Sequence, residues 1–145
     1  MFVNRRLVRI EWGDCDPAGI VFYPRYFAMF DHSTAMLLEA ATGLTKYQMR
    51  ERYDFVGFPM VDTGAKFIIP SKFGDDIVIE SAVESFGRSS FNVIHKVWKG
   101  DALAIEARET RVWAGRHPDD PSRMKSKPVP DEIVARLRGR TTIDV

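Results

Sequence analysis

The feature that most constrains the fold is a series of four β-like segments in the second half of the chain. They are Met60 to Ile69, Ile77 to Phe86, Ser89 to Trp98 and Ala102 to Ala114. The connections between them are short and rich in turn residues, such as Gly87-Arg88 and Lys99-Gly100-Asp101. Short connections of this kind join antiparallel neighbours, so the pattern predicts a meander of strands.

Upstream of these segments the pattern predicts one strand and one long helix. Residues Val3 to Trp12 alternate with the period of two that is typical of a strand. From about Pro24 to Ala41 apolar residues recur at spacings of three and four, and Gly43 supplies a C-terminal stop. The order predicts an α+β fold, in which a five-stranded antiparallel sheet packs on one helix.

Two further stretches carry weaker signals. Leu44 to Asp54 has no clear periodicity, whereas Asp131 to Leu137 is able to form a short helix. Because one helix covers little of a five-stranded sheet, we expect a second subunit to cover the apolar remainder and to protect the strand edges.

Length and composition predict a single globular domain over residues 1–145, with 45% hydrophobic and 28% charged residues. No run of about 18 apolar residues could span a bilayer, and the N-terminus lacks the pattern of a signal peptide, so we expect a cytoplasmic protein. A net charge of +1 predicts no general attraction to nucleic acid or to a membrane. The single cysteine, Cys15, excludes an internal disulfide.

The loop before the helix reads Gly-Asp-Cys-Asp-Pro-Ala-Gly-Ile-Val-Phe-Tyr-Pro-Arg-Tyr over residues 13–26. This block closely resembles the 4-hydroxybenzoyl-CoA thioesterase family of hotdog proteins. The likeness continues through the Phe-x-x-Pro-x-x-x-x-Asp-Asp pattern of residues 67–76, Arg-Ser-Ser-Phe at 88–91 and Val-Pro at 129–130. It implies a hotdog fold, a homodimer with active sites at the subunit interface, and often a homotetramer. It also implies an acyl-CoA thioesterase without a cofactor, since coenzyme A is part of the substrate.

Asp16 is the predicted catalytic residue. Pro17 restricts the backbone of Asp16 to extended conformations, and Gly19 leaves room for a ligand beside the carboxylate. The resemblance implies that Asp16 is either the nucleophile or the general base that activates water; alternatively, it only caps a turn. The backbone N–H of Tyr23, at the expected helix N-terminus, would polarise the thioester oxygen.

Asp31 lies on the apolar stripe of the predicted helix, where a carboxylate requires a partner. It would bind either a polar group on the acyl ring or a structural hydrogen-bond donor. The resemblance also points to Phe58 and Pro59 as substrate-binding residues. Because the family places a small hydroxyl residue where this chain has Phe58, we expect an acyl pocket that is more apolar or differently shaped.

The phosphates of CoA require basic or hydroxyl side chains. Arg88, Ser89 and Ser90 in a predicted turn offer a guanidinium and two hydroxyls, and the resemblance adds Lys125 from the basic C-terminal segment. Alternatively, the turn and the C-terminal segment are only solvated and bind no phosphate.

Three other functions compete with hydrolysis of an aromatic acyl-CoA. One is a thioesterase for short aliphatic acyl-CoA, another is a CoA-binding module without catalysis, and the third is a dehydratase or hydratase, which would need a catalytic histidine in the loop. Cys15 has no histidine at a spacing that suggests a base, so we expect a buried bystander thiol. The three histidines, His32, His95 and His117, show no pairing typical of a metal site.

Overall fold

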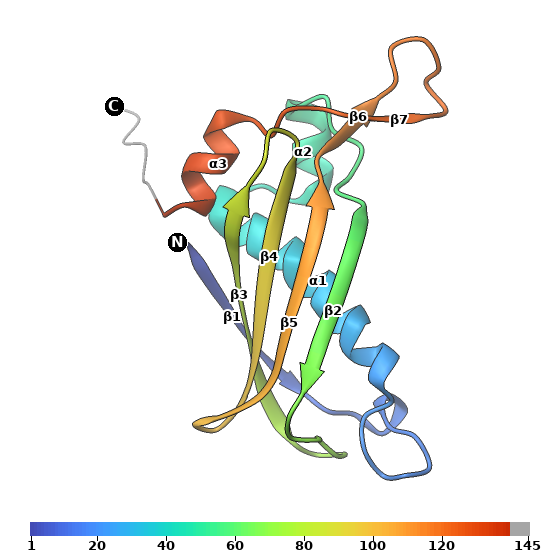
Figure 1. The fold of residues 1–145 in the computed structure, drawn as a ribbon, viewed down its shortest axis with the longest axis vertical. Coiled ribbons are helices and arrows are strands. Elements are labelled where there is room, and N and C mark those ends of the chain that lie inside the picture. Colours follow the sequence, from blue (N-terminus) through green and yellow to red (C-terminus); the bar gives the residue numbers. More distant parts are fainter. Residues whose placement is uncertain (140–145) are drawn as a thin grey trace.

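The computed structural model describes residues 1–139, in which one antiparallel sheet packs against one long helix (Figure 1). The sheet has the strand order β1-β3-β4-β5-β2. The strands are β1 (Val3–Arg9), β2 (Met60–Phe67), β3 (Asp76–Phe86), β4 (Ser90–Lys99) and β5 (Ala102–Val112). The predicted five-stranded sheet and long helix are therefore confirmed.

The predicted meander is wrong for one of its strands. Strands β3, β4 and β5 form hairpins in sequence, but β2 pairs with β5 at the far edge and not with β3. The connection over residues 68–75 instead runs along the end of the sheet, where Ile68 donates to Ala104 O and Val21 donates to Ser71 O. A turn-rich connector of this length allows a hairpin but does not require one, and here it serves as a crossover.

Helix α1 (Tyr23–Thr42) crosses one face of the sheet obliquely, and its N-terminal end extends past edge strand β2 (Figure 1). Gly43 ends it in a left-handed conformation with φ of 72°, which glycine adopts without a steric cost. The buried side of α1 comprises Tyr26, Phe30, Ser33, Thr34, Leu37, Leu38 and Ala41. The hydroxyls of Tyr26, Ser33 and Thr34 show that the interface with the sheet is not wholly apolar.

Smaller elements close the ends of the layer. They are the 3₁₀ turn η1 (Trp12–Asp14), the helices α2 (Lys46–Arg52) and α3 (Asp131–Leu137), and the short hairpin of β6 (Ala114–Arg116) and β7 (Met124–Ser126). Helix α3 was predicted, whereas α2 lies in the stretch without clear periodicity. In α2 the Thr45 hydroxyl accepts from the Gln48 N–H and the Gln48 side chain accepts from the Thr45 N–H, so a capping box defines its start.

The sheet face turned away from α1 carries both apolar and charged side chains, with exposed Leu7 opposite Val78 in one row. One row across all five strands alternates in sign, because register pairs Arg5 with Glu80, Glu80 with Lys96, Lys96 with Glu106 and Glu106 with Lys66. A further set of exposed apolar side chains lies at the β2 edge and beside the N-terminus of α1. It comprises Ile20, Phe22, Tyr23, Met60, Val61, Phe67 and Ile68. Among the helices of residues 1–139, none has the length and hydropathy needed to cross a membrane.

Candidate active site

The loop before α1 is a tight hairpin that holds Asp16 near its tip. The Phe22 N–H donates to Asp14 O over 2.8 Å, and the Asp16 N–H donates to Ile20 O over 3.0 Å. At the tip the Gly19 N–H returns to Asp16 O over 2.9 Å, with a φ of 84° at Gly19 that favours glycine. Backbone hydrogen bonds therefore set the position of Asp16 relative to the start of α1.

One oxygen of the Asp16 carboxylate is engaged and the other is available. Oδ1 accepts from the Ala18 N–H over 2.8 Å, as in an Asx turn, while among residues 1–139 no protein donor bonds to Oδ2. The half-buried carboxylate lines a cavity of about 350 Å³. The other residues lining it are Trp12, Cys15, Pro17, Gly19 and Phe73. Turn capping by Asp16 is thus compatible with a second role for the free oxygen.

Cys15 differs in detail from the prediction. It is half-buried rather than buried, and its Sγ contacts Glu11 O at 3.7 Å. Within residues 1–139 the Cys15 thiol is hydrogen-bonded to this carbonyl and not to a histidine.

Tyr23 is the first residue of α1, so its N–H has no acceptor within the helix. The residue is 61% exposed, and its ring meets those of Phe27 and Phe67 edge-on, at centroid distances of 6.4 and 6.5 Å. Phe27 and Phe67 are in turn 6.3 Å apart. Tyr23 lines a cavity of about 160 Å³ separate from that of Asp16. One chain therefore presents the Tyr23 N–H beside a cluster of aromatic rings. The Asp16 carboxylate lies on the hairpin that leads into the same helix.

Asp31 lies two helical turns beyond Tyr23 and is bound by a residue that the sequence analysis did not identify. Its Oδ1 accepts from Arg111 Nη2 of β5 over 2.9 Å. The Asp31 side chain is 67% exposed, whereas that of Arg111 is 4% exposed. Arg111 also donates through Nε and Nη2 to the two oxygens of buried Glu109, each over 3.1 Å. The exposed carboxylate is thus anchored to a buried ion pair.

Behind Glu109 the polar cluster continues into the core. The Thr34 hydroxyl donates to Glu109 Oε1 over 2.5 Å, and His95 Nε2 lies 3.3 Å from the same oxygen. Since the Thr34 hydroxyl gives its proton to Glu109, it can only accept from His95 Nε2, at 3.2 Å. Ser81 bonds the other ring nitrogen, Nδ1, over 2.7 Å. Every polar group in this cluster therefore has a partner.

The cluster keeps Glu109 ionised in spite of its burial. Burial alone would raise the pKa of this carboxyl, but hydrogen bonds from His95 and Arg111 lower the pKa to about 2. The hydroxyl of Thr34 acts in the same direction. At neutral pH Glu109 is consequently a carboxylate that balances the charge of Arg111.

Strand parity could have identified these residues. Ser81, His95, Glu109 and Arg111 all fall on the alternating positions that face α1, as their burial shows. A charged residue at an inward position requires a partner, and Asp31 of α1 has the complementary charge to Arg111. Asp31 itself is exposed, so its predicted place on the apolar face of the helix is wrong, whereas the predicted need for a partner is met by Arg111. Asp31 is recognisable in the sequence as a carboxylate that needs a partner, whereas Arg111 and Glu109 become recognisable only when the alternating positions along β5 are counted.

The predicted CoA-binding residues gather at the other end of the sheet. Arg88 and Ser89 lie in the turn between β3 and β4; the Val129 N–H donates to Arg88 O and the Trp113 N–H to Ser89 O. Ser90 begins β4. Lys125 lies in β7 and pairs with Gly115 of β6, the strand that follows Trp113. The turn and the C-terminal segment are therefore neighbours, as one phosphate site would require.

Phe58 occupies the core of its own chain. Its side chain is 3% exposed and packs against Phe55 and Phe91, at centroid distances of 5.7 and 6.2 Å. The Phe58 carbonyl accepts from Arg111 Nη1 over 3.3 Å. Pro59 beside it is half-buried, and its carbonyl accepts from the Val112 N–H. A substrate contact by the Phe58 ring stays a prediction, and it would require the ring to leave this packing.

The two groups of site residues are separated by the length of β4. The Asp16 hairpin contacts residues 70–75, which also bind Lys99 at the end of β4. Arg88 lies just before Ser90, the first residue of β4, whereas Lys99 is the last residue of this strand. Strand rise puts the two ends roughly 30 Å apart.

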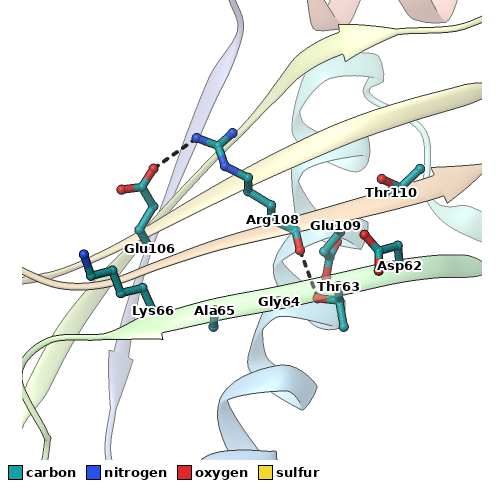
Figure 2. Close-up of a pocket in the computed structure, with 9 residues that line it drawn as sticks. All are labelled: Asp62, Thr63, Gly64, Ala65, Lys66, Glu106, Arg108, Glu109 and Thr110. Atoms are coloured by element: carbon teal, nitrogen blue, oxygen red, sulfur yellow. Dashed lines mark hydrogen bonds and ion pairs between the residues drawn. The ribbon is translucent and has the colours of Figure 1, made fainter.

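A hollow of about 450 Å³ lies along the open edge of the sheet, over β2 and β5 (Figure 2). Its outer rim is charged, with Arg108 paired to Glu106 and Lys66 nearby. Its lining comes from β2 and β5 alone and includes Glu109, and the hollow follows the unpaired edge of the sheet. Within the described residues no group of three or more His, Cys, Asp or Glu side chains is arranged to hold a metal.

Comparisons with known proteins agree with this geometry. The family described as the thioesterase-like superfamily matches residues 10–137. A 4-hydroxybenzoyl-CoA thioesterase of Pseudomonas sp. strain CBS-3 is 33% identical over 132 residues, which are 87% of this chain and 91% of that one. A solved structure of an aspartate-to-asparagine variant of 4-hydroxybenzoyl-CoA thioesterase, complexed with 4-hydroxybenzoyl-CoA, superposes with a TM-score of 0.86 at 28% identity, covering 94% and 99% of the two chains. A gentisyl-coenzyme A thioesterase superposes with a TM-score of 0.77 at 25% identity, covering 93% and 99%.

Proposed function

The chain belongs to the thioesterase-like superfamily and has the hotdog fold, and from that premise we propose that it hydrolyses an aromatic acyl-CoA to the free acid and CoA. The observation that carries this proposal is the Asp16 carboxylate, held in a backbone-bonded hairpin with one oxygen free beside a cavity. Two relatives named above act, by their names, on aromatic acyl-CoA substrates.

Hydrolysis begins when an oxygen attacks the thioester carbonyl carbon. The oxygen comes either from Asp16 itself, giving an acyl-enzyme anhydride that water then cleaves, or from a water molecule that Asp16 deprotonates. In both routes the C–S bond breaks and CoA leaves as a thiolate. Because a thiol has a pKa of about 8.5, its thiolate leaves without a strong general acid.

The start of α1 supplies the stabilisation that the attack needs. Negative charge develops on the carbonyl oxygen, and the free Tyr23 N–H, at the positive end of the helix dipole, can donate to it. Only the main chain is required for this role. The exposed rings of Tyr23 and Phe67, with the half-buried ring of Phe27 between them, then offer apolar aromatic surface to the acyl group, which favours an aromatic ring over a short aliphatic chain.

The complete site is shared between two subunits in this proposal. One chain leaves β2 as an unpaired edge and separates Asp16 from Arg88 by the length of the sheet. Antiparallel pairing of β2 with the β2 of a second copy would bury the edge and would reverse the partner's direction. The Arg88 end of one subunit then approaches the Asp16 end of the other. A homodimer is the minimum unit, and a homotetramer is formed from two of them.

Release of free thiol from a panel of acyl-CoAs tests the proposal. We expect the highest kcat/KM with a hydroxylated or unsubstituted aromatic acyl group. A preference for short aliphatic acyl-CoA would place the protein among aliphatic thioesterases, and CoA binding without thiol release would make it a non-catalytic module.

A further inference from the structure

The buried ion pair behind Asp31 takes no direct part in the proposed hydrolysis. Arg111 uses all three guanidinium nitrogens: Nη2 on Asp31 and Glu109, Nε on Glu109, and Nη1 on the Phe58 carbonyl. A guanidinium with every nitrogen engaged has one orientation. The Asp31 carboxylate that it holds is consequently fixed as well, although most of its surface is open to solvent.

The charges of this cluster do not cancel. It contains one guanidinium, on Arg111, and two carboxylates, on Asp31 and Glu109. Glu109 faces Arg111 with both oxygens from inside the core and balances its charge there. Asp31 therefore keeps its own negative charge on the open side, with Oδ2 unbonded by protein donors among residues 1–139.

Glu109 in turn cannot rotate away from Arg111. Its Oε1 is held by Thr34 of α1 and lies against His95 of β4, and the His95 ring is stacked on Phe30 with centroids 5.1 Å apart. Three elements, α1, β4 and β5, are thus joined behind the single exposed carboxylate. An arrangement of this kind orients a surface group more precisely than a lone side chain on a helix would.

We propose that Arg111 and Glu109 are positioning residues that set the acyl selectivity of the enzyme by holding Asp31 as a fixed hydrogen-bond acceptor. The inference rests on the proposed function, because it assumes that the acyl ring lies along Tyr23 and Phe27 and ends near Asp31. The favoured acyl group carries a neutral donor, such as a hydroxyl, at the end distant from the thioester. A group carrying a carboxylate there is rejected, since Glu109 leaves Arg111 no unbalanced charge to attract it.

The test compares kcat/KM for 4-hydroxybenzoyl-CoA and benzoyl-CoA in four proteins: wild type, Asp31→Asn, Arg111→Met and the double variant. In Arg111→Met the preference for the hydroxylated ring should fall by about tenfold or more, mainly through KM, because the contact is present in both ground and transition states. The double variant should show the same preference as Asp31→Asn alone, since Arg111 acts through Asp31. Arg111→Lys, which keeps the charge, should restore part of the preference.

Arg108→Met is the matched control, because Arg108 lies on the same strand with its ion pairs to Glu84 and Glu106 on the opposite face (Figure 2). The Arg108→Met variant should prefer the hydroxylated ring as strongly as wild type does. If Arg111→Met does not fold, the Glu109→Gln/Arg111→Met variant removes both buried charges together and answers the same question.

An unchanged preference in the folded Arg111 variant, or losses that add in the double variant, would overturn the inference. Failure of the wild type to hydrolyse either substrate would overturn the proposed function and this inference with it. Hydrolysis of both rings with selectivity unaffected by Arg111 would overturn the inference alone.

Discussion

Asp16 and Arg88 of one chain lie at opposite ends of strand β4, separated by roughly 30 Å of sheet. Each belongs to a group of site residues with its own supporting backbone contacts, the hairpin before α1 in one case and the β3–β4 turn in the other. The unpaired edge of β2 provides the means of bringing the two groups together across a two-fold axis.

Mixed oligomers of two defective variants test this sharing. Asp16→Asn and Arg88→Ala subunits, refolded together, should regain activity at low substrate concentration, because each mixed dimer has one site with neither change. Light scattering at micromolar concentration should give a dimer or a tetramer. No gain over the separate variants would mean that each chain completes its own site, and a monomer would remove the shared site altogether.

Arg88→Ala and Lys125→Ala should each raise KM with little change in kcat. Contacts with CoA phosphates are made equally in ground and transition states, so they contribute uniform binding. The increase in KM should become smaller as salt screens exposed charges, which steady-state kinetics at two ionic strengths would show. A collapse of kcat in Arg88→Ala would place this residue near the reacting carbonyl instead.

Phe58→Thr should lower the free energy of unfolding by about 3 kcal/mol, because it leaves a cavity beside Phe55 and Phe91. Urea denaturation measures this, with Tyr47→Thr as a control because the Tyr47 residue is 71% exposed. Unchanged stability together with a new ranking of aromatic acyl-CoAs would contradict a core position and would support the pocket role predicted from the sequence.

The low pKa of Glu109 predicts that the folded protein loses stability in acid. Its pKa is about 2 in the folded protein and about 4.5 when unfolded, so its contribution to stability is complete above the unfolded value and is lost as pH falls toward 2. The loss should be about 3 kcal/mol between roughly pH 5 and 2. Comparison of unfolding free energies across this range in wild type and Glu109→Gln measures it, with Glu84→Gln on the outer face as control. Equal pH profiles in Glu109→Gln and wild type would contradict the depressed pKa.

The fold could be predicted well where a local pattern determines it. Pro24 to Ala41 shows helical periodicity and Gly43 ends the helix, as the structure confirms. The position of β2 could not be predicted, since the connector after Phe67 is compatible with a hairpin or a crossover. Helix α2 was missed because its start depends on the reciprocal hydrogen bonds of Thr45 and Gln48 rather than on an apolar stripe.

In the candidate site too, residues of one local motif could be predicted, whereas residues brought together by the fold could not. Asp16 and Tyr23 lie in one continuous segment, so a motif in that segment could indicate both. Arg111 and Glu109 are 80 and 78 residues beyond Asp31 in the chain, and only the β5 register beneath α1 brings them together. Phe58 was assigned to the acyl pocket by resemblance, whereas its burial depends on Phe55 and Phe91, which pattern alone does not place beside it.

The most direct test is the turnover of Asp16→Asn on the best acyl-CoA substrate, measured by thiol release beside a CoA-binding measurement. The variant keeps the size of the side chain and an oxygen able to accept from Ala18, so the hairpin should be retained. We predict a kcat reduced by at least about a hundredfold with CoA binding preserved, as expected for loss of a positioned base or nucleophile. A kcat near that of wild type would contradict the assignment of Asp16 as the catalytic residue.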